Sequence, residues 1–416
     1  MSKTKSFDIS KRLLWNAYLR VAQNHGAAGV DEISITKFEE NLKDNLYKLW
    51  NRMSSGSYFP VPVKAVAISK ATGGERILGI PSVADRIAQT AVALYLEPLV
   101  EPKFHADSYG YRPNKSALDA VGVARKRCWK SDWTIDLDIS GFFDNLDHEL
   151  VMRAIKKHTD CKWVLLYIER WMKAPMQMLD GTLKGRDRGV SQGSSISPLI
   201  SNIFMHHAFD EWMNIKYPTI PFERYVDDGL VHCKTKQQAD FMQNAIKERL
   251  AKCKLTLHPE KTQVVYCKDD DRKGNYSIQS FDFLGYTFRP RMAKNRYGKH
   301  FVSFLPAISN KAKNKIRKTI RSWKIHRITW TTLEEISKKV NPIVRGWYQY
   351  YGQFYKSEVY QPLRNVERYL EKWTRCKYKK LKHHGRLARR YLGKVRKRSP
   401  NIFFHWTLGL GSPMTE

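Results

Sequence analysis

The sequence predicts an α+β protein in which a mixed region of strands and helices precedes a helical, basic region. Three observations support this class. Short apolar runs alternate at strand spacing within the first 288 residues, amphipathic helical patterns lie between them, and the later pattern is nearly all helical. With 416 residues and 42% hydrophobic content, the chain can bury a sizeable core in about two or three packed modules.

The expected elements follow one another without an internal repeat. The pattern predicts largely helical structure over 8–53 with a break at 26–29 and a second helix at 34–50, strands at 63–68 and 76–80, a helix at 84–100, a strand at 133–139, a helix capped by Asp147, a helix at 198–213, a hairpin at 222–233, a helix at 237–252, strands at 262–267 and 281–288, and helices at 310–323, 333–350 and 360–382.

Positive charge is concentrated in the later part of the chain. The formal net charge is +33. Residues 289–400 hold 32 Lys and Arg against 5 Asp and Glu, a net of 32 − 5 = +27, which leaves 33 − 27 = +6 for the rest. A solvated basic surface would also produce a charge run, but a bias this local favours a nucleic-acid partner bound through phosphate neutralisation. The charge shift and the change to helical pattern predict a domain boundary near 289–297.

The remaining features of the composition mainly argue against particular kinds of site and protein. The six cysteines form no C-x-x-C pair, so neither a zinc site nor a disulfide framework is indicated. The N-terminus does not resemble a signal peptide, and no apolar run approaches about 20 residues. We therefore expect a protein of the cytoplasm that has no membrane partner.

The most informative stretch is Tyr225-Val226-Asp227-Asp228, which lies between two runs of strand character. Two aspartates in a tight turn are usually only a turn. Adjacent carboxylates nevertheless repel each other, and a divalent cation would offset that repulsion. Mg²⁺ suits such a place because it binds one or two carboxylates together with substrate phosphates.

A third carboxylate comes from the strand expected at 133–139. Asp136 and Asp138 share one face of that strand, and Asp136 is expected to be paired or to cap. Asp138 ends the strand just before a glycine turn. If the two strands pair in one sheet, Asp138 would approach Asp227 and Asp228. Two Mg²⁺ ions about 3.5–4 Å apart would then allow all three to stay ionised and would support in-line phosphoryl transfer.

Several motifs occur together in a familiar order. Asp138 is followed five residues later by Phe143, then by Gln192-Gly193 and the hairpin at 225–228. Further similar stretches are 80–86, 108–112, 196–199, 258–262, 283–288 and 345–347. Together they resemble bacterial group II intron reverse transcriptases, the intron maturases, over about residues 10–406. Each stretch alone is weak, whereas the ordered set is very specific.

The resemblance implies a right-hand polymerase fold of fingers, palm and thumb, with an antiparallel palm sheet and a helical basic C-terminal region. It implies RNA-directed DNA polymerase activity on an RNA template with a DNA primer and dNTPs. Asp138, Asp227 and Asp228 would be the catalytic residues that hold Mg²⁺. A specific structured RNA, such as a group II intron or a related non-coding RNA, would be a further partner.

The resemblance also implies roles for residues around the nucleotide. Lys70 and Arg76 would hold the incoming triphosphate, and Phe143 would be the steric gate that excludes a 2′-hydroxyl. Gln192 would contact the nucleotide, and Lys261 would be a candidate general acid for pyrophosphate. Without the family, Phe143 would be read as a core aromatic and Lys261 as a surface lysine.

Four regions follow from the same resemblance: an N-terminal extension at 1–60, fingers and palm at 61–290, a thumb or maturase domain at 291–365, and a DNA-binding-like extension at 366–416. Most aromatic side chains of the thumb are expected in the core, and the cations are expected to meet nucleic acid. The nucleic-acid contacts expected are Arg345, Lys356, Lys377, Lys379, Arg389 and Arg390.

The sequence departs from the family in three places. Val226 replaces the usual Ala, Ser191 replaces the Pro that would stiffen its loop, and no Cys/His-rich nuclease module precedes Glu416. With these departures, two interpretations remain: an enzyme of a mobile intron, or a domesticated enzyme that serves phage defence or DNA repair. An RNA-binding maturase without polymerase activity and an RNA-dependent RNA polymerase are further alternatives. The complete aspartate set argues against the former, and Phe143 argues against the latter.

Overall fold

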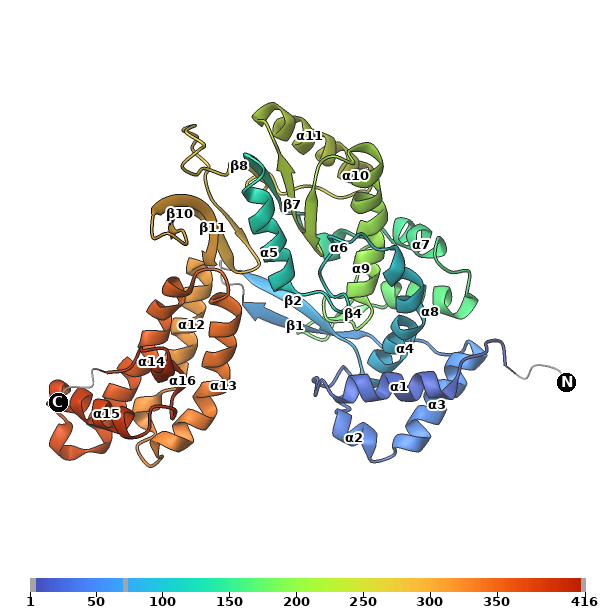
Figure 1. Ribbon diagram of the computed structural model, residues 1–416. Helices are drawn as coiled ribbons and strands as arrows, with labels where there is room; N and C mark the ends of the chain where they lie inside the picture. Colours follow the sequence, from blue (N-terminus) through green and yellow to red (C-terminus); the bar gives the residue numbers. More distant parts are fainter. Residues whose placement is uncertain (1–4, 70–73, 413–416) are drawn as a thin grey trace. The chain divides into compact units, whose positions relative to one another are not determined.

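The computed structural model describes residues 5–69 and 74–412 (Figure 1). The chain forms two compact units. The first unit comprises residues 1–124 and 133–264, and the second comprises residues 125–132 and 265–416. Within the described ranges, no helix combines the length and apolar character that crossing a membrane requires.

Helix α4 is buried over most of its first half, whereas Leu99 near its end is exposed. Ser82 caps α4 by accepting a hydrogen bond from the Asp85 N–H, and α1 and α9 pack against the helix. The helices are α1 (Lys11–Ala22), α2 (Ile35–Glu39), α3 (Leu42–Ser55), α4 (Val83–Val100), η1 (Glu101–Lys103), α5 (Ala117–Cys128, which ends in the second unit), α6 (Phe142–Asn145), α7 (His148–Lys156), α8 (Lys162–Lys173), α9 (Ser197–Met205), η2 (His206–Asp210), α10 (Glu211–Lys216) and α11 (Lys236–Lys252).

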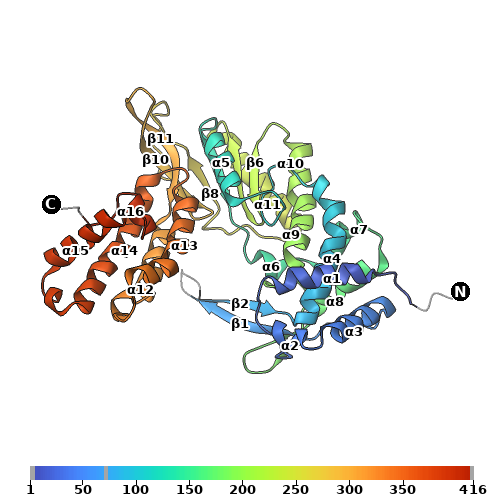
Figure 2. The ribbon, with the colours of Figure 1, turned by 60° about the horizontal axis from the view of Figure 1, so that its bottom comes forward.

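Two of the expected helices are interrupted in the structure. The helix expected at 34–50 is two helices, α2 and α3, because Asn41 adopts a non-helical conformation and the Asn45 amide donates to the Phe38 carbonyl at 2.9 Å (Figure 2). The helix expected at 198–213 contains the π-helical turn η2 between α9 and α10. Asp147 caps α7 as expected, through the Leu150 N–H at 3.0 Å.

A four-stranded sheet of the first unit contains the hairpin expected at 63–80. Its strands are β1 (Val63–Ser69), β2 (Glu75–Ile80), β4 (Met176–Gln177) and β5 (Leu183–Lys184), in the order β2-β1-β4-β5. β1 and β2 are antiparallel, and Ile68 pairs with Arg76. The tip of this hairpin, including Lys70 and Gly73, lies outside the described residues.

A second sheet of this unit carries the aspartates. Its strands β6 (Phe222–Tyr225), β7 (Asp228–Cys233) and β3 (Trp133–Leu137) are neighbours in that order, all antiparallel. Helix α11 packs on β3 and β7. β8 (Gln263–Tyr266) lies where the chain passes from the first unit to the second. The expected hairpin and the pairing of its second strand with β3 are thus both present.

The second unit contains a three-stranded antiparallel sheet, in the order β11-β10-β9, followed by a helical bundle (Figure 1). Thr332 and Glu335 form a capping box at the start of α13, and the rings of Trp323 and Trp347 stack with centroids 5.6 Å apart. The elements are β9 (Phe281–Phe283), β10 (Tyr286–Lys294), β11 (His300–Ile308), α12 (Asn310–Ser322), η3 (Ile325–Arg327), α13 (Leu333–Tyr351), α14 (Lys356–Lys377), η4 (Lys379–Leu381), α15 (Gly385–Arg398) and α16 (Phe404–Thr407).

The structure differs from the sequence prediction at the expected boundary. The strand expected at 281–288 is divided into β9 and β10, and β10 continues through Arg289 to pair with β11. The compact units instead divide between Val264 and Val265. Cations alternate with apolar residues along β10, so the charge shift begins inside a strand and not at the start of the helices.

Candidate active site

The turn at 225–228 joins β6 to β7, and Tyr225 pairs with Asp228 across it. Val226 at its centre is 3% exposed and has φ +63°. A β-branched residue in this left-handed region is an outlier, because its branched carbon crowds the backbone. Such a conformation persists only where the surrounding contacts hold it in place.

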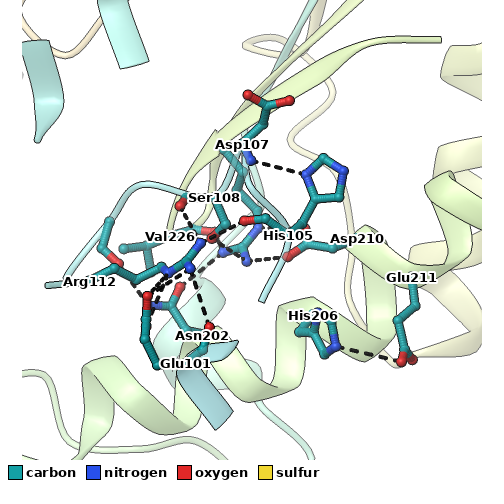
Figure 3. A network of polar contacts seen from close by, with 12 residues as sticks. Glu101, His105, Asp107, Ser108, Arg112, Asn202, His206, Asp210, Glu211 and Val226 are labelled. Atoms are coloured by element: carbon teal, nitrogen blue, oxygen red, sulfur yellow. Dashed lines mark hydrogen bonds and ion pairs between the residues drawn. The ribbon is translucent and has the colours of Figure 1, made fainter. Parts of the chain in front are cut away.

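Arg224 supplies the main restraint on this turn. Its Nη1 donates to the Val226 carbonyl at 2.7 Å and to Asn202 Oδ1 at 3.1 Å. Its Nε and Nη2 donate to Asp210 at 2.9 and 2.7 Å, and Nη2 also donates to Ser108 Oγ at 2.9 Å. Figure 3 shows these partners around the turn. Arg224 and Asp210 are both buried, so each charge depends on the other for compensation.

The segment before Arg112 closes the other side of the turn. Tyr109 N–H donates to the Arg224 carbonyl at 2.8 Å, and the Asn202 amide donates to the Gly110 carbonyl at 2.7 Å. A Cβ at Gly110 would lie 2.5 Å from Val226 Cγ2 and 2.8 Å from Val226 N. Glycine is therefore required there. Sequence reasoning used 108–112 only as part of the family pattern and assigned no role to Arg224, Asp210 or Gly110.

The strand register brings the three aspartates to one place. Leu137 pairs with Gly229, so Asp138, which follows β3, lies beside Asp228, which opens β7. Burial, Asp227 and Asp138 raise the pKa of Asp228 to about 7, although Lys261 lowers it. Burial and Asp138 likewise raise the pKa of Asp227. Although many protein atoms surround its carboxylate, the Asp228 residue as a whole is exposed to solvent, which leaves room for a ligand.

The turn at 258–262 fixes Asp138 and places Lys261 on it. The His258 N–H donates to the Asp138 carbonyl at 2.7 Å, and the Asp138 N–H donates to Thr262 Oγ1 at 3.2 Å. Lys261 Nζ lies 2.9 Å from Asp138 Oδ2. The lysine side chain is 62% exposed, so this ion pair contributes little to stability, and the ammonium can leave it.

The other described residues of the expected nucleotide site meet around the loop at 189–193. The Val190 N–H donates to the Phe143 carbonyl at 2.8 Å, which ties half-buried Phe143 to this loop. The Gln192 carbonyl accepts from the Gly79 N–H at 3.1 Å, and the Arg76 Nε donates to Gln192 Oε1. Arg76 also lowers the pKa of Asp227, opposing the effect of burial.

Hydrogen bonds hold this loop in place, although it has Ser191 where the family usually has proline. Ser191 is 5% exposed, and its hydroxyl donates to the Gly79 carbonyl at 3.2 Å. The Ser197 hydroxyl donates to the Ser191 carbonyl at 2.8 Å. Hydrogen bonds thus restrain the loop without the fixed φ of proline.

The residues of the second unit that are expected to contact nucleic acid differ in solvent exposure and in their contacts within the protein. Lys377 Nζ donates to the Thr331 carbonyl and lies 4.8 Å from the Trp373 ring centre, and Arg345 stacks over Phe404. Half-buried Lys377 thus supports the fold of the bundle. The exposed cations of the expected set are Arg345, Lys356, Lys379, Arg389 and Arg390.

Comparison with known protein families identifies the family of the chain that carries this site. The family model described as reverse transcriptase (RNA-dependent DNA polymerase) matches residues 68–288, which include all three aspartates. The chain belongs to the reverse transcriptase family. A second family, described as the group II intron, maturase-specific domain, matches residues 313–392 in the helical part of the second unit.

Individual relatives agree with the two family matches. Protein YkfC of Escherichia coli (strain K12) is 30% identical over 327 residues, covering 69% of this chain and 81% of that protein. The group II intron-encoded protein LtrA of Lactococcus lactis subsp. cremoris is 25% identical over 466 residues, covering 90% of this chain and 73% of that protein. The putative COX1/OXI3 intron 1 protein of Saccharomyces cerevisiae is 26% identical over 218 residues.

This reverse transcriptase is a group II-like enzyme, an RNA-directed DNA polymerase with a right-hand polymerase fold, as the sequence motifs predicted. Its described residues form an α+β structure with mainly antiparallel sheets; β1 and β4 pair in parallel. Enzymes of this family use divalent metal ions and nucleic-acid substrates. The roles of individual residues stay predictions.

Replacing Gly110 by Ala should destabilise the aspartate turn. The added Cβ would overlap Val226, and overpacking of this kind costs about 1–3 kcal/mol in the free energy of unfolding. Chemical denaturation would measure the loss. Gly385→Ala is the matched control, since a Cβ there meets nothing within 4 Å. Adding Val226→Ala should recover only part of the loss, because the contact with the Val226 backbone nitrogen remains. Equal stability of Gly110→Ala and Gly385→Ala would contradict the packing argument.

Proposed function

We propose that the enzyme extends a DNA primer on an RNA template with two Mg²⁺ ions held by Asp138, Asp227 and Asp228, while bound to a specific structured RNA. The carrying observation is that Asp138, just after β3, meets Asp227 and Asp228 of the β6–β7 turn, and that the pKa values of Asp227 and Asp228 are raised. Carboxylates this close are stable as anions only when cations compensate them.

The donor set suits Mg²⁺. Only carboxylate oxygens are offered, and hard cations such as Mg²⁺ prefer oxygen ligands. The bound ions would supply activation of the primer oxygen and stabilisation of charge on the leaving pyrophosphate. The protein's own contribution is to hold Asp138 through the turn at 258–262 and Asp227 through the Arg224 network.

Residues around the loop at 189–193 would select and bind the nucleotide. Arg76 would bind triphosphate oxygens together with Lys70, and releasing Gln192 from Arg76 would free its amide for the nucleotide. The Phe143 ring would lie against the sugar and exclude a 2′-hydroxyl. Lys261, next to Asp138 and exposed, would protonate the pyrophosphate as it leaves.

The second unit would act as thumb and DNA-binding extension, with residues 1–60 as the N-terminal extension. Its exposed cations, including Lys356, Lys379, Arg389 and Arg390, would neutralise nucleic-acid phosphates. The maturase-specific match at 313–392 favours a second role in binding intron or related RNA. The departures at Val226 and Ser191 keep a role in phage defence or DNA repair as an alternative. The bacterial cytoplasm is the expected location.

Replacing the turn aspartates separates polymerisation from RNA binding. Asp227→Asn with Asp228→Asn should lower the primer-extension rate roughly a thousandfold or more, since several kcal/mol of charge stabilisation are lost. Template–primer affinity should persist. Glu248→Gln, an exposed substitution on α11, is the control. Undiminished extension by the double variant would refute the assignment, whereas a parent protein that binds RNA but extends no primer would favour the maturase role alone.

Metal binding should depend on pH near neutrality. The pKa of Asp228 is raised to about 7 in the metal-free fold, so the carboxyl is protonated below that pH and cannot bind metal. Between about pH 6 and pH 8, Mg²⁺ affinity should therefore rise, by at most about tenfold per pH unit, with proton release on binding. Isothermal titration calorimetry in two buffers of different ionisation enthalpy measures both. Asp228→Asn should abolish this pH dependence; an unchanged profile in that variant would exclude Asp228 as its source.

Shortening Phe143 tests the sugar contact. Phe143→Val should raise the efficiency of ribonucleotide use relative to dNTP use by roughly tenfold or more, because the removed ring leaves space for one oxygen. Steady-state incorporation kinetics with matched rNTP and dNTP pairs measure the ratio. Phe241→Val, at a side chain 59% exposed on α11, is the control. If both variants keep the parent's selectivity, Phe143 is a structural aromatic.

A further inference from the structure

Three histidines and a glutamate meet in the first unit at a place that the proposed polymerase chemistry does not use. His158 follows α7, His206 and His207 open the π-helical turn η2, and Glu211 opens α10. They line a cleft of about 480 Å³ together with Lys103. Figure 3 shows His206 beside Glu211.

The polar atoms of this cluster face one another at short range. His158 Nε2 lies 2.9 Å from His207 Nε2, and His207 Nδ1 lies 2.5 Å from Glu211 Oε2. His206 Nε2 lies 3.5 Å from Glu211 Oε1. One ligand atom from each of His206, His207 and Glu211 falls within 4.8 Å of the other two.

The π-helical turn explains why adjacent histidines can reach one carboxylate. The Glu211 N–H donates to the His206 carbonyl, five residues back, so this turn is wider than an α-helical one. His206 and His207 therefore both approach Glu211, at spacings of five and four residues. π-helical turns of this kind are rare and are frequently found at functional sites.

The surrounding residues leave the cluster available to a ligand. Asp210 is excluded from it, because its carboxylate is bound by Arg224. The nitrogen of His206 that faces the cluster is Nε2, 3.5 Å from Glu211 Oε1, whereas its Nδ1 is buried without a hydrogen-bond partner on the other side of the ring. Burial, His207 and Lys103 lower the pKa of His158 to about 4, so its neutral ring can accept a hydrogen bond from His207.

We propose that His206, His207 and Glu211 form a binding site for a borderline transition-metal ion of the Zn²⁺ class, separate from the polymerase aspartates. Two imidazole nitrogens with one carboxylate suit Zn²⁺ and disfavour Mg²⁺. His206 would bind through Nε2, 3.5 Å from Glu211 Oε1, and His207 through Nδ1, which faces Glu211 Oε2. The other nitrogen of His207, Nε2, would then donate its hydrogen to His158 Nε2, as metal-bound histidines commonly do toward a neighbouring acceptor. The bound ion would thus hold η2 against the start of α10, and His158 would link it to the end of α7.

The competing interpretation is a hydrogen-bonded chain without a metal. Lys103 Nζ can donate to His158 Nδ1, His158 Nε2 to His207 Nε2, and His207 Nδ1 to Glu211. That chain includes His158, His207 and Glu211 but leaves out His206, whose Nε2 lies 3.5 Å from Glu211 Oε1. Direct metal titration distinguishes the two interpretations without measuring polymerase activity.

The test uses the full-length protein, stripped with a chelator and kept in saturating Mg²⁺ so that the aspartate site does not take up Zn²⁺. Zn²⁺ titration against a chromophoric competitor should show about one tightly bound ion, and Co²⁺ should give the absorption of a tetrahedral site. His207→Gln should lose this binding, and Glu211→Gln should weaken it about 10–100-fold. His300→Gln, at an exposed histidine on β11, should bind as the parent does.

Equal Zn²⁺ affinity in His207→Gln, Glu211→Gln and His300→Gln, or no binding by the parent, would overturn the proposal in favour of the hydrogen-bonded chain. Circular dichroism first establishes that each variant is folded. If His207→Gln does not fold, X-ray absorption spectroscopy of the Zn²⁺-loaded parent decides. Imidazole ligands are expected, and a spectrum with oxygen ligands alone would reject the site.

Discussion

The buried ion pair between Arg224 and Asp210 is the interaction on which the candidate active site depends. It fixes the guanidinium, which in turn holds the Val226 carbonyl and keeps a β-branched residue at φ +63°. Removing either partner would leave an uncompensated buried charge, which is far more costly than the pair itself. The direction of Asp227 and Asp228 is thus set by a residue just before them and by a helical turn distant in sequence.

In contrast to the Arg224–Asp210 pair, the charges of the active-site aspartates are only partly compensated. Nothing among the described residues compensates them fully: Lys261 and Arg76 lower the pKa values of Asp228 and Asp227, yet both remain raised. The fold therefore brings together charges that repel one another. The divalent cation proposed for this place would relieve that repulsion and would compete with protons near neutral pH.

The elements of the first unit could be predicted from the sequence more fully than those of the second. The hairpin at 222–233, the strand ending near Asp138 and the cap at Asp147 were predicted because their signals are local: alternation, adjacent acids and a capping residue. The domain boundary predicted near 289–297 stays a prediction: the segment begins on β10, whereas the compact units divide after Val264. β11 was not predicted, since its pairing with β10 is visible only in three dimensions.

The sequence by itself determined the family and its activity, because ordered motifs such as those at 138–143, 191–193 and 225–228 are chemically specific. It also predicted that Asp138 would meet Asp227 and Asp228, which the strand register confirms. Only the tertiary structure decided what holds them: Arg224, Asp210 and Gly110 act through contacts between segments about 14 to 116 residues apart. The histidine cluster emerged in the same way, since a π-helical turn and the end of α7 must meet before its nitrogens converge.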